Sequence, residues 1–239
     1  MKVSLITHTP YPLDVLMFTK STRLEMNPDL LVEIAGKTEK EKADEIAYMA
    51  KTIRSSWEFV DIIFLIEGIT RATAQQMTRT RNASFAMQSQ RVADVSKMAI
   101  SCPFDAGTEA HRNFMYSARI AKSTYTTLIE GGAPKQDARG ILPINITTNL
   151  VAKYNLRNFV DLVVARESLR ASDEYVDVVR EMKAAVLLAM PWAEPFFVSK
   201  YDMAVGMLEA LAKKSGITPG EGDGWEIAKV IDLLRSTGA

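Results

Sequence analysis

Residues 79–91 concentrate side chains that bind anions. This thirteen-residue segment holds three arginines, two serines and two glutamines, and it contains no acidic residue. Guanidinium groups pair bidentately with phosphate oxygens, and hydroxyl and amide groups complete the set of donors. Residues 66–77, just before it, are typical of a strand end that continues into a helix. We therefore expect a phosphate-bearing ligand near the end of this helix.

Two further segments add arginines, at residues 138–143 and on a helix that starts near residue 155. On that helix Arg166 and Arg170 are four residues apart and share a face, so a bound anion would relieve their repulsion. For any single arginine, the ordinary alternative is a solvated helix face or a surface ion pair. That alternative is weaker for residues 79–91, because no acidic partner lies among them.

The charge of the whole chain is balanced, which sets the arginine-rich segment apart. The 239 residues include 29 Lys and Arg against 29 Asp and Glu, and 47% of them are apolar. A neutral chain argues against a nucleic-acid polymer or a membrane surface as the partner. No apolar stretch has the length of a membrane span. A small anionic ligand matches this composition better.

Cysteine and histidine are scarce in the chain. Cys102 is the one cysteine, and His8 and His111 are the two histidines. These counts exclude a disulfide framework, argue against a metal site and fit a cytoplasmic compartment. The N-terminus is not typical of a signal peptide. Cys102 as a nucleophile is an alternative, but a lone cysteine is more often a small core residue.

The pattern of apolar residues and breakers predicts an α+β fold in which helices dominate. Thr38 and Glu41 have the spacing of a capping box, and residues 3–6 and 59–66 have the composition of strands. One domain is expected over residues 1–215, followed by a linker and a C-terminal helix over 216–239. Helices are expected at residues 14–24, 38–53, 70–80, 108–128, 134–140, 155–188 (one long helix or a broken pair), 196–214 and 225–234.

The arginine segment also resembles a family signature. Arg79-Thr80-Arg81, then seven residues, then Ser89 is similar to the Arg-His-Arg, seven residues, Ser pattern of flavin-dependent thymidylate synthases. The similarity spans residues 40–195. Other segments that resemble the family in the same order are Gly68–Arg71, Ala138–Pro143, Asn155–Arg157 and Pro191-Trp192.

The resemblance implies a fold and a reaction. The fold would be helix-rich α+β with a small, mostly antiparallel sheet. The chain would form a homotetramer whose active sites are shared between subunits. FAD would be the cofactor, with NADPH and methylenetetrahydrofolate as co-substrates. The reaction would transfer one carbon to C5 of dUMP to give dTMP, without a cysteine nucleophile.

The resemblance also assigns residues to roles. Arg166 would be catalytic, because its permanent charge would favour the ionised form of the uracil. The residues implied for the nucleotide are Gln76, Arg79, Gln88, Ser89, Gln90, Arg91 and Arg139. The residues implied for FAD are Ser56, Arg79, Thr80, Arg81, Asn155, Arg157 and Asp161.

This chain departs from the family pattern on the flavin and folate side. Thr80 stands where the family has His, Met87 where it usually has Glu, and Val92 where it has Tyr. The family's His-x-x-x-x-Glu-His stretch corresponds to residues 54–60, which contain no histidine. Two alternatives therefore stay open. One is a hydroxymethylase of the same fold acting on dUMP or dCMP, and the other is a nucleotide-binding homologue without catalysis.

Overall fold

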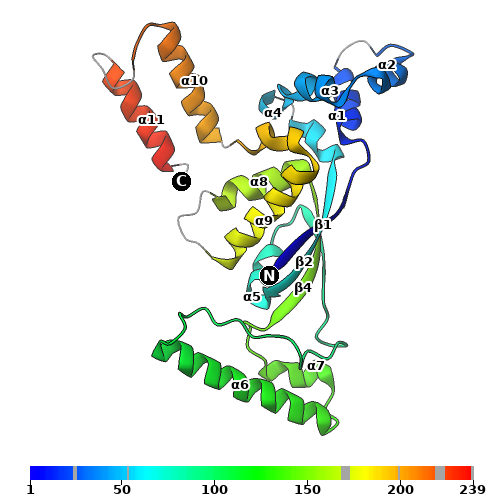
Figure 1. Ribbon diagram of the computed structural model, residues 1–239, viewed down its shortest axis with the longest axis vertical. Coiled ribbons are helices and arrows are strands. Elements are labelled where there is room, and N and C mark those ends of the chain that lie inside the picture. Colours follow the sequence, from blue (N-terminus) through cyan, green and yellow to red (C-terminus); the bar gives the residue numbers. More distant parts are fainter. Residues whose placement is uncertain (24–25, 53, 168–172, 199, 219–223, 238–239) are drawn as a thin grey trace. The chain divides into compact units, whose positions relative to one another are not determined.

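A computed structural model describes residues 1–23, 26–52, 54–167, 173–198, 200–218 and 224–237 (Figure 1). The chain forms two compact units. The first combines Met1–His8 with Asp61–Tyr154, and the second combines Thr9–Val60 with Asn155–Ala239. Each unit is thus assembled from stretches far apart in sequence. The domain boundary predicted at residue 215 lies inside the second unit and stays a prediction.

The first unit is built on a four-stranded sheet with the strand order β1-β2-β4-β3. β1 (Lys2–His8) pairs antiparallel with β2 (Asp61–Thr70), and β3 (Ala83–Met87) pairs antiparallel with β4 (Thr147–Asn155). In Figure 1, β1, β2 and β4 run side by side. Buried and half-buried residues alternate in β2 from Asp61 to Ile66, as in a sheet with one covered face. The expected helix-rich α+β fold with a small antiparallel sheet is confirmed.

Sequence patterns located the strands only in part. β2 begins at Asp61 instead of residue 59, because Arg54–Phe59 forms a 3₁₀-helix, η1. β3 lies inside the arginine segment and was not predicted, nor was β4. Residues 79–91 are therefore a turn, a strand and a loop, rather than the end of a helix alone. The short β3 alternates half-buried and exposed residues, but the polar residues before and after it in the arginine segment hide this pattern.

Two helices of the first unit, α5 and α6, begin with threonine caps. The Thr70 side chain accepts a hydrogen bond from the Thr73 amide, and that of Thr108 accepts one from the His111 amide. Such caps satisfy amides that have no partner within the helix. α6 and α7 lie side by side in Figure 1. The bounds are α5 (Arg71–Met77), α6 (Glu109–Glu130), α7 (Lys135–Ala138) and the 3₁₀-helix η2 (Arg139–Ile141).

The second unit is helical and packs around large aromatic residues. Trp57 is 2% exposed, its ring centroid lies 4.9 Å from that of Phe196, and its indole N–H donates to the Met49 carbonyl. The bounds are α1 (Pro12–Ser21), α2 (Leu30–Gly36), α3 (Glu39–Ile46), α4 (Met49–Thr52), α8 (Leu156–Glu167), α9 (Glu174–Ala189), the 3₁₀-helix η3 (Pro191–Phe197), α10 (Lys200–Lys214) and α11 (Trp225–Thr237).

The predicted capping box of Thr38 and Glu41 is confirmed, with both reciprocal hydrogen bonds present. The helix predicted over 38–53 is divided into α3 and α4, and α2 was not predicted. The helix expected from residue 196 starts at Lys200, since Pro191 and Pro195 in η3 lack the amide hydrogens of a regular helix. Within the described ranges, no helix is long and apolar enough to cross a membrane.

Candidate functional site

Asn149 on β4 joins three segments at one end of the sheet. Its side-chain oxygen accepts a hydrogen bond from the Gly68 amide of β2, at 3.1 Å. Its carbonyl accepts one from the Gln88 amide, at 3.0 Å, directly after β3 ends. The ends of β2 and β3 and the beginning of β4 therefore meet. This end of the sheet carries the second part of the arginine segment, Gln88–Arg91, whereas Arg79 and Arg81 precede β3 at its other end.

Arg71, the first residue of α5, lies at this end of the sheet. Its amide donates to the Ile146 carbonyl, which precedes β4, at 3.0 Å. Its Nη1 atom is buried and has no hydrogen-bond partner among the described residues. Burial lowers the pKa of the Arg71 guanidinium from its ordinary value, and the positive charge of Arg139 lowers it further. Two cations thus lie near each other, and neither forms an ion pair within the described ranges.

Arg139 is positioned by an apolar cluster formed by Val95, Tyr125, Ala138 and Ile146. Ala138 is 3% exposed and immediately precedes Arg139, whose Nε donates to the Gln136 carbonyl at 3.1 Å. Ile146 in the same cluster accepts the Arg71 amide. One cluster therefore fixes the backbone on both sides of the pair of guanidinium groups.

Gln88 and Gln90 add buried amide groups to this end of the unit. The Gln88 Oε1 and Gln90 Nε2 atoms are buried without a hydrogen-bond partner in the described chain, and Gln90 is 7% exposed. An unpaired buried polar atom costs about 1–3 kcal/mol, so native proteins usually satisfy it. A ligand that both accepts and donates hydrogen bonds would satisfy these two atoms.

The remaining predicted residues of the first unit are more accessible. Gln76, Arg79, Arg81, Ser89 and Arg91 are exposed, and Thr80 is half-buried. Ser89 Oγ accepts a hydrogen bond from the Arg91 amide at 3.2 Å, which shapes the loop after β3. Of the ion pairs among described residues, none involves an arginine of this unit.

Two of the residues that the resemblance assigns to FAD in the second unit, Arg157 and Asp161, already form ion pairs with residues of η1. Arg157 Nη1 lies 2.5 Å from Glu58 Oε1, and Asp161 forms an ion pair with Arg54. The Arg54 guanidinium also lies over the Trp57 ring, 5.0 Å from its centroid. Glu58 lies in η1, directly before the strand predicted over residues 59–66, and faces Arg157.

Asn155 and Ser56, the other two residues that the resemblance assigns to FAD in this unit, are less available to a ligand. Asn155 Oδ1 accepts the Asn158 amide at 2.9 Å, so it caps the first turn of α8. Ser56 is 5% exposed, on the 3₁₀-helix η1. Arg157 and Asp161 share a face of α8 as predicted, and each reaches a residue of η1 instead of its neighbour.

Arg166 lies in the last turn of α8 and contacts an aromatic ring. Its guanidinium carbon is 4.0 Å from the centroid of the Tyr175 ring, on α9. Sequence analysis singled out Arg166 but overlooked Tyr175. The second arginine of the predicted pair, Arg170, lies outside the described residues.

Sequence analysis also missed Arg71 as a candidate for anion binding. The family resemblance used it only as part of the strand-to-helix junction. Its position directly after the helix cap Thr70, at the end of a buried strand, was the available signal. Cys102, predicted to be a small core residue, is half-buried.

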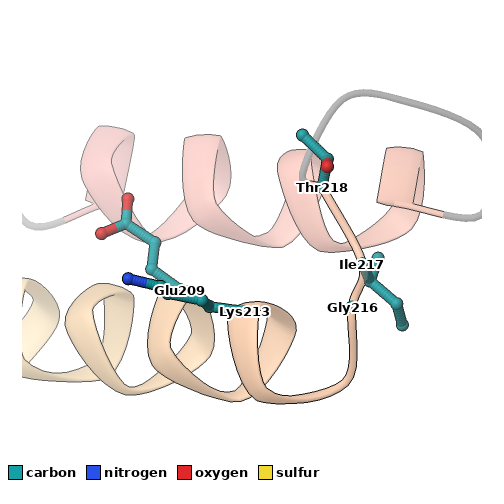
Figure 2. Close-up of a pocket in the computed structure, with 5 residues that line it drawn as sticks. All are labelled: Glu209, Lys213, Gly216, Ile217 and Thr218. Carbon is teal, nitrogen blue, oxygen red and sulfur yellow. The ribbon is translucent and has the colours of Figure 1, made fainter.

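A hollow of about 490 Å³ lies at the turn after α10 (Figure 2). Glu209 and Lys213 line it from α10, and residues 216–218 line it from the connection toward α11. None of the predicted site residues lines this hollow. Among the described residues, no cluster of three or more His, Cys, Asp or Glu is placed to hold a metal ion.

Comparison with known proteins gives a consistent family. The sequence model of the family described as Thymidylate synthase complementing protein matches residues 4–192. A flavin-dependent thymidylate synthase of Nitratidesulfovibrio vulgaris is 32% identical over 72% of this chain and 77% of its own. That of Geobacter sulfurreducens is 26% identical over 92% of this chain and 94% of its own.

Solved structures share the fold at lower identity. Thymidylate Synthase X of Helicobacter pylori, solved with FAD and dUMP, has a TM-score of 0.63 at 19% identity and covers 82% of this chain and 97% of its own. A UMP/dUMP methylase of Streptomyces cacaoi, bound with 5-Br dUMP, also has a TM-score of 0.63 at 19% identity, with 82% and 93% covered. By its family match and its relatives, this chain is an enzyme that belongs to the flavin-dependent thymidylate synthase family.

Proposed function

We propose that this enzyme transfers one carbon from methylenetetrahydrofolate to C5 of dUMP and so forms dTMP, with FAD as cofactor and NADPH as reductant. The observation that carries the proposal is the unpaired polar set of the first unit. Arg71 Nη1, Gln88 Oε1 and Gln90 Nε2 are buried without partners in the described chain. A nucleotide monophosphate offers both an anion for the guanidinium and a polar ring edge for the amides.

The guanidinium groups of Arg71 and Arg139 would bind the phosphate of dUMP. Each presents a planar set of donors that matches phosphate oxygens bidentately. An anion between them would remove their mutual repulsion and raise the lowered pKa of Arg71 toward its ordinary value. Ser89, Arg91 and Gln76 are accessible and would complete the contacts. The side-chain amides of Gln88 and Gln90 would form hydrogen bonds with the polar edge of the uracil ring.

The residues assigned to FAD by the resemblance fit a cofactor that carries a diphosphate. Arg79 and Arg81 are exposed and pair with no carboxylate among the described residues, and the hydroxyl of Thr80 lies between them in sequence. When bound, FAD would supply the reducing equivalents that complete the methyl group. Arg157 and Asp161 would contact it in exchange for their present partners, Glu58 and Arg54.

Arg166 would act on the pyrimidine. A guanidinium stays protonated at any working pH, so it stabilises negative charge that develops on the ring. In a homotetramer with shared active sites, the residues that serve one ligand come from more than one subunit. The homotetramer and the cytoplasmic location stay predictions.

A hydroxymethylase is the second candidate, and Thr80 favours it. The family pattern has His at that position, and residues 54–60 lack the family's histidines. A change on the flavin side can alter the final reduction while nucleotide binding persists. In that case water, instead of hydride, would complete the reaction and leave a hydroxymethyl group on dUMP or dCMP.

A spectrum and a product assay test these proposals. We expect a bound-flavin absorption spectrum with FAD that shifts when dUMP is added. We then expect dUMP, methylenetetrahydrofolate and NADPH to give a product heavier than dUMP by one methylene group. A product heavier by a further oxygen would identify the hydroxymethylase. Nucleotide binding without any turnover of dUMP or dCMP would support the third alternative, a nucleotide-binding homologue without catalysis.

A further inference from the structure

The contact between Arg166 and Tyr175 differs from the other arginine contacts of the second unit. Arg54 and Arg157 pair with carboxylates, whereas Arg166 lies with its guanidinium carbon 4.0 Å from the centroid of the Tyr175 ring. Arg166 is half-buried, and it forms neither an ion pair nor a hydrogen bond with any residue of the described ranges. The aromatic ring is therefore what holds this guanidinium.

We propose that Tyr175 is a positioning residue, whose ring holds the Arg166 guanidinium in the orientation that acts on the pyrimidine. This rests on the role proposed above for Arg166. A cation is attracted to the face of an aromatic ring, and the contact strengthens when water is excluded. Stacking occupies the flat face of the guanidinium and leaves its five N–H donors free in the plane. A carboxylate partner would use those donors and neutralise the charge.

The ring of Tyr175 is well suited to be a fixed platform. Tyr175 is 1% exposed and lies in the first turn of α9. Asp173 caps this turn, because its side chain accepts the Val176 amide at 2.9 Å. A buried ring on a capped helix turn has little freedom to move. The arginine side chain, which is long and flexible, takes its orientation from the ring.

The carboxylate nearest to Arg166 in sequence is engaged elsewhere. Glu167 lies 2.8 Å from Lys183 Nζ, a residue of α9. This ion pair links α8 to α9 and keeps Glu167 from neutralising its neighbour. This ion pair and the contact of Arg166 with Tyr175 both link α8 to α9. In the second contact no carboxylate of the described residues neutralises the cation, which leaves it free for a ligand.

The ring, and not the hydroxyl, carries this role. The Tyr175 hydroxyl is buried and has no hydrogen-bond partner among the described residues. Removing it leaves the aromatic face in place and removes an unpaired polar group. Tyr175→Phe is therefore the conservative variant, and Tyr175→Leu is the variant that removes the platform but keeps an apolar side chain.

Steady-state kinetics on the full-length protein test the proposal. We expect Tyr175→Leu to lower kcat about tenfold, with the KM for dUMP within about threefold of wild type. Tyr175→Phe should keep kcat within about twofold and melt at the same temperature or higher. In an Arg166→Ala background, Tyr175→Leu should cause no further loss. Equal losses in Phe and Leu variants, no loss in the Leu variant, or a full further loss in the double variant would overturn the proposal.

An arginine NMR measurement separates this proposal from the proposed reaction. The Nε–H signal of Arg166, assigned by its absence in Arg166→Ala, should be shifted upfield by the ring in wild type and in Tyr175→Phe. It should return to an ordinary position in Tyr175→Leu. If the wild type shows no turnover, the proposed reaction is contradicted. The Arg166 signal alone then tests whether the Tyr175 ring positions the Arg166 guanidinium. An Arg166 signal at an ordinary position in wild type would refute the proposal. This outcome needs only the wild-type protein, so it decides even if Tyr175→Leu does not fold.

Discussion

In the first unit Arg71 lies near Arg139 and forms no ion pair with a described residue, whereas in the second unit Arg54 and Arg157 are matched by Asp161 and Glu58. The two units also differ in burial. The Arg71 Nη1 atom is buried, while the arginines of both ion pairs keep at least a third of their side-chain surface exposed. Arg54 and Arg157 thus each have a carboxylate partner, although Arg54 Nε itself is buried without a hydrogen-bond partner, whereas Arg71 has no carboxylate partner among the described residues.

This difference indicates how each unit meets a ligand. Burying a cation without a partner is unfavourable, so an anion that binds the first unit restores an interaction that the free protein lacks. In the second unit a ligand has to replace an ion pair that already exists. Exposed ion pairs contribute only about 0–1 kcal/mol, so breaking one costs a ligand little binding free energy. The pair of Arg71 and Arg139 is organised for an anion in advance, whereas Arg54 and Arg157 are not.

The largest expected effect comes from Arg71→Met. The substitution should raise the Kd for dUMP by a factor that corresponds to roughly 2–5 kcal/mol, because it removes one partner of a desolvated charge contact. The melting temperature of the free protein should stay the same or rise, since a cation with no partner is removed. Calorimetric titration and thermal melting measure the two quantities.

Arg119→Met is the matched control for Arg71→Met. Arg119 is exposed on α6 of the same unit, and its Nε donates only to the Met115 carbonyl of its own helix. The charge change is identical, so a general electrostatic effect would appear in both variants. Equal loss of dUMP affinity in the two would contradict a specific role of Arg71.

Arg91→Ala should have a smaller effect on the same Kd. Arg91 is exposed, so its contact with a phosphate is screened by water, and a loss of about 1 kcal/mol is expected. Titration with dUMP at low and high salt checks this, because the difference between wild type and variant should shrink at high salt. A loss as large as that of Arg71→Met would mean that Arg91 becomes buried when the nucleotide binds.

Glu58→Gln should strengthen FAD binding, whereas the two arginine substitutions weaken dUMP binding. The substitution releases Arg157 from its ion pair, so FAD affinity should rise by up to about 1 kcal/mol. Fluorescence quenching of FAD measures this change. Glu181→Gln, on the exposed side of α9, is the control with the same charge difference. Weaker FAD binding in Glu58→Gln than in this control would show that Glu58 itself contacts the cofactor.

The smallest effect concerns the pH dependence of stability. The hydrogen bond from Lys37, with a further contribution from Lys20, lowers the pKa of Glu45 below its ordinary value. A lowered carboxyl pKa contributes stability above its unfolded value, near 4.5, and this contribution disappears as the pH falls through the folded value. The stability difference between wild type and Glu45→Gln should therefore shrink on acidification below that pH, which denaturant titrations can follow. A difference that stays constant would contradict the assignment.

Local signals predicted helix starts better than strands. Thr38 with Glu41, and Thr108 before α6, act through contacts within one turn, which a sequence displays directly. β3 and β4 depend on partners far along the chain, and the arginine and glutamine content around β3 obscures its alternation. For residues 155–188 the sequence pattern was compatible with one long helix or a broken pair, because the same apolar period continues through both parts. The described residues form two helices there, α8 and α9.

The candidate site could be predicted by residue type, but its electrostatics could not. The family resemblance pointed to Arg139 and to Gln88–Arg91, which the structure places in the first unit. It could not reveal that the Arg71 Nη1 atom is buried and that Arg71 lies near Arg139, since this depends on the fold of an apolar cluster. Nor could it reveal the Tyr175 ring under Arg166, because nine positions separate the two residues and no periodic pattern links them.

The central claim is that the first unit of this enzyme holds an unsatisfied cationic site for the phosphate of a pyrimidine nucleotide. The most direct test is a pair of calorimetric titrations of the wild-type protein, one with dUMP and one with deoxyuridine, which lacks the phosphate. We predict saturable binding of dUMP that weakens with salt, and binding of deoxyuridine that is weaker by at least about a hundredfold. Equal affinity for the two compounds would contradict the claim, since the phosphate would then contribute nothing.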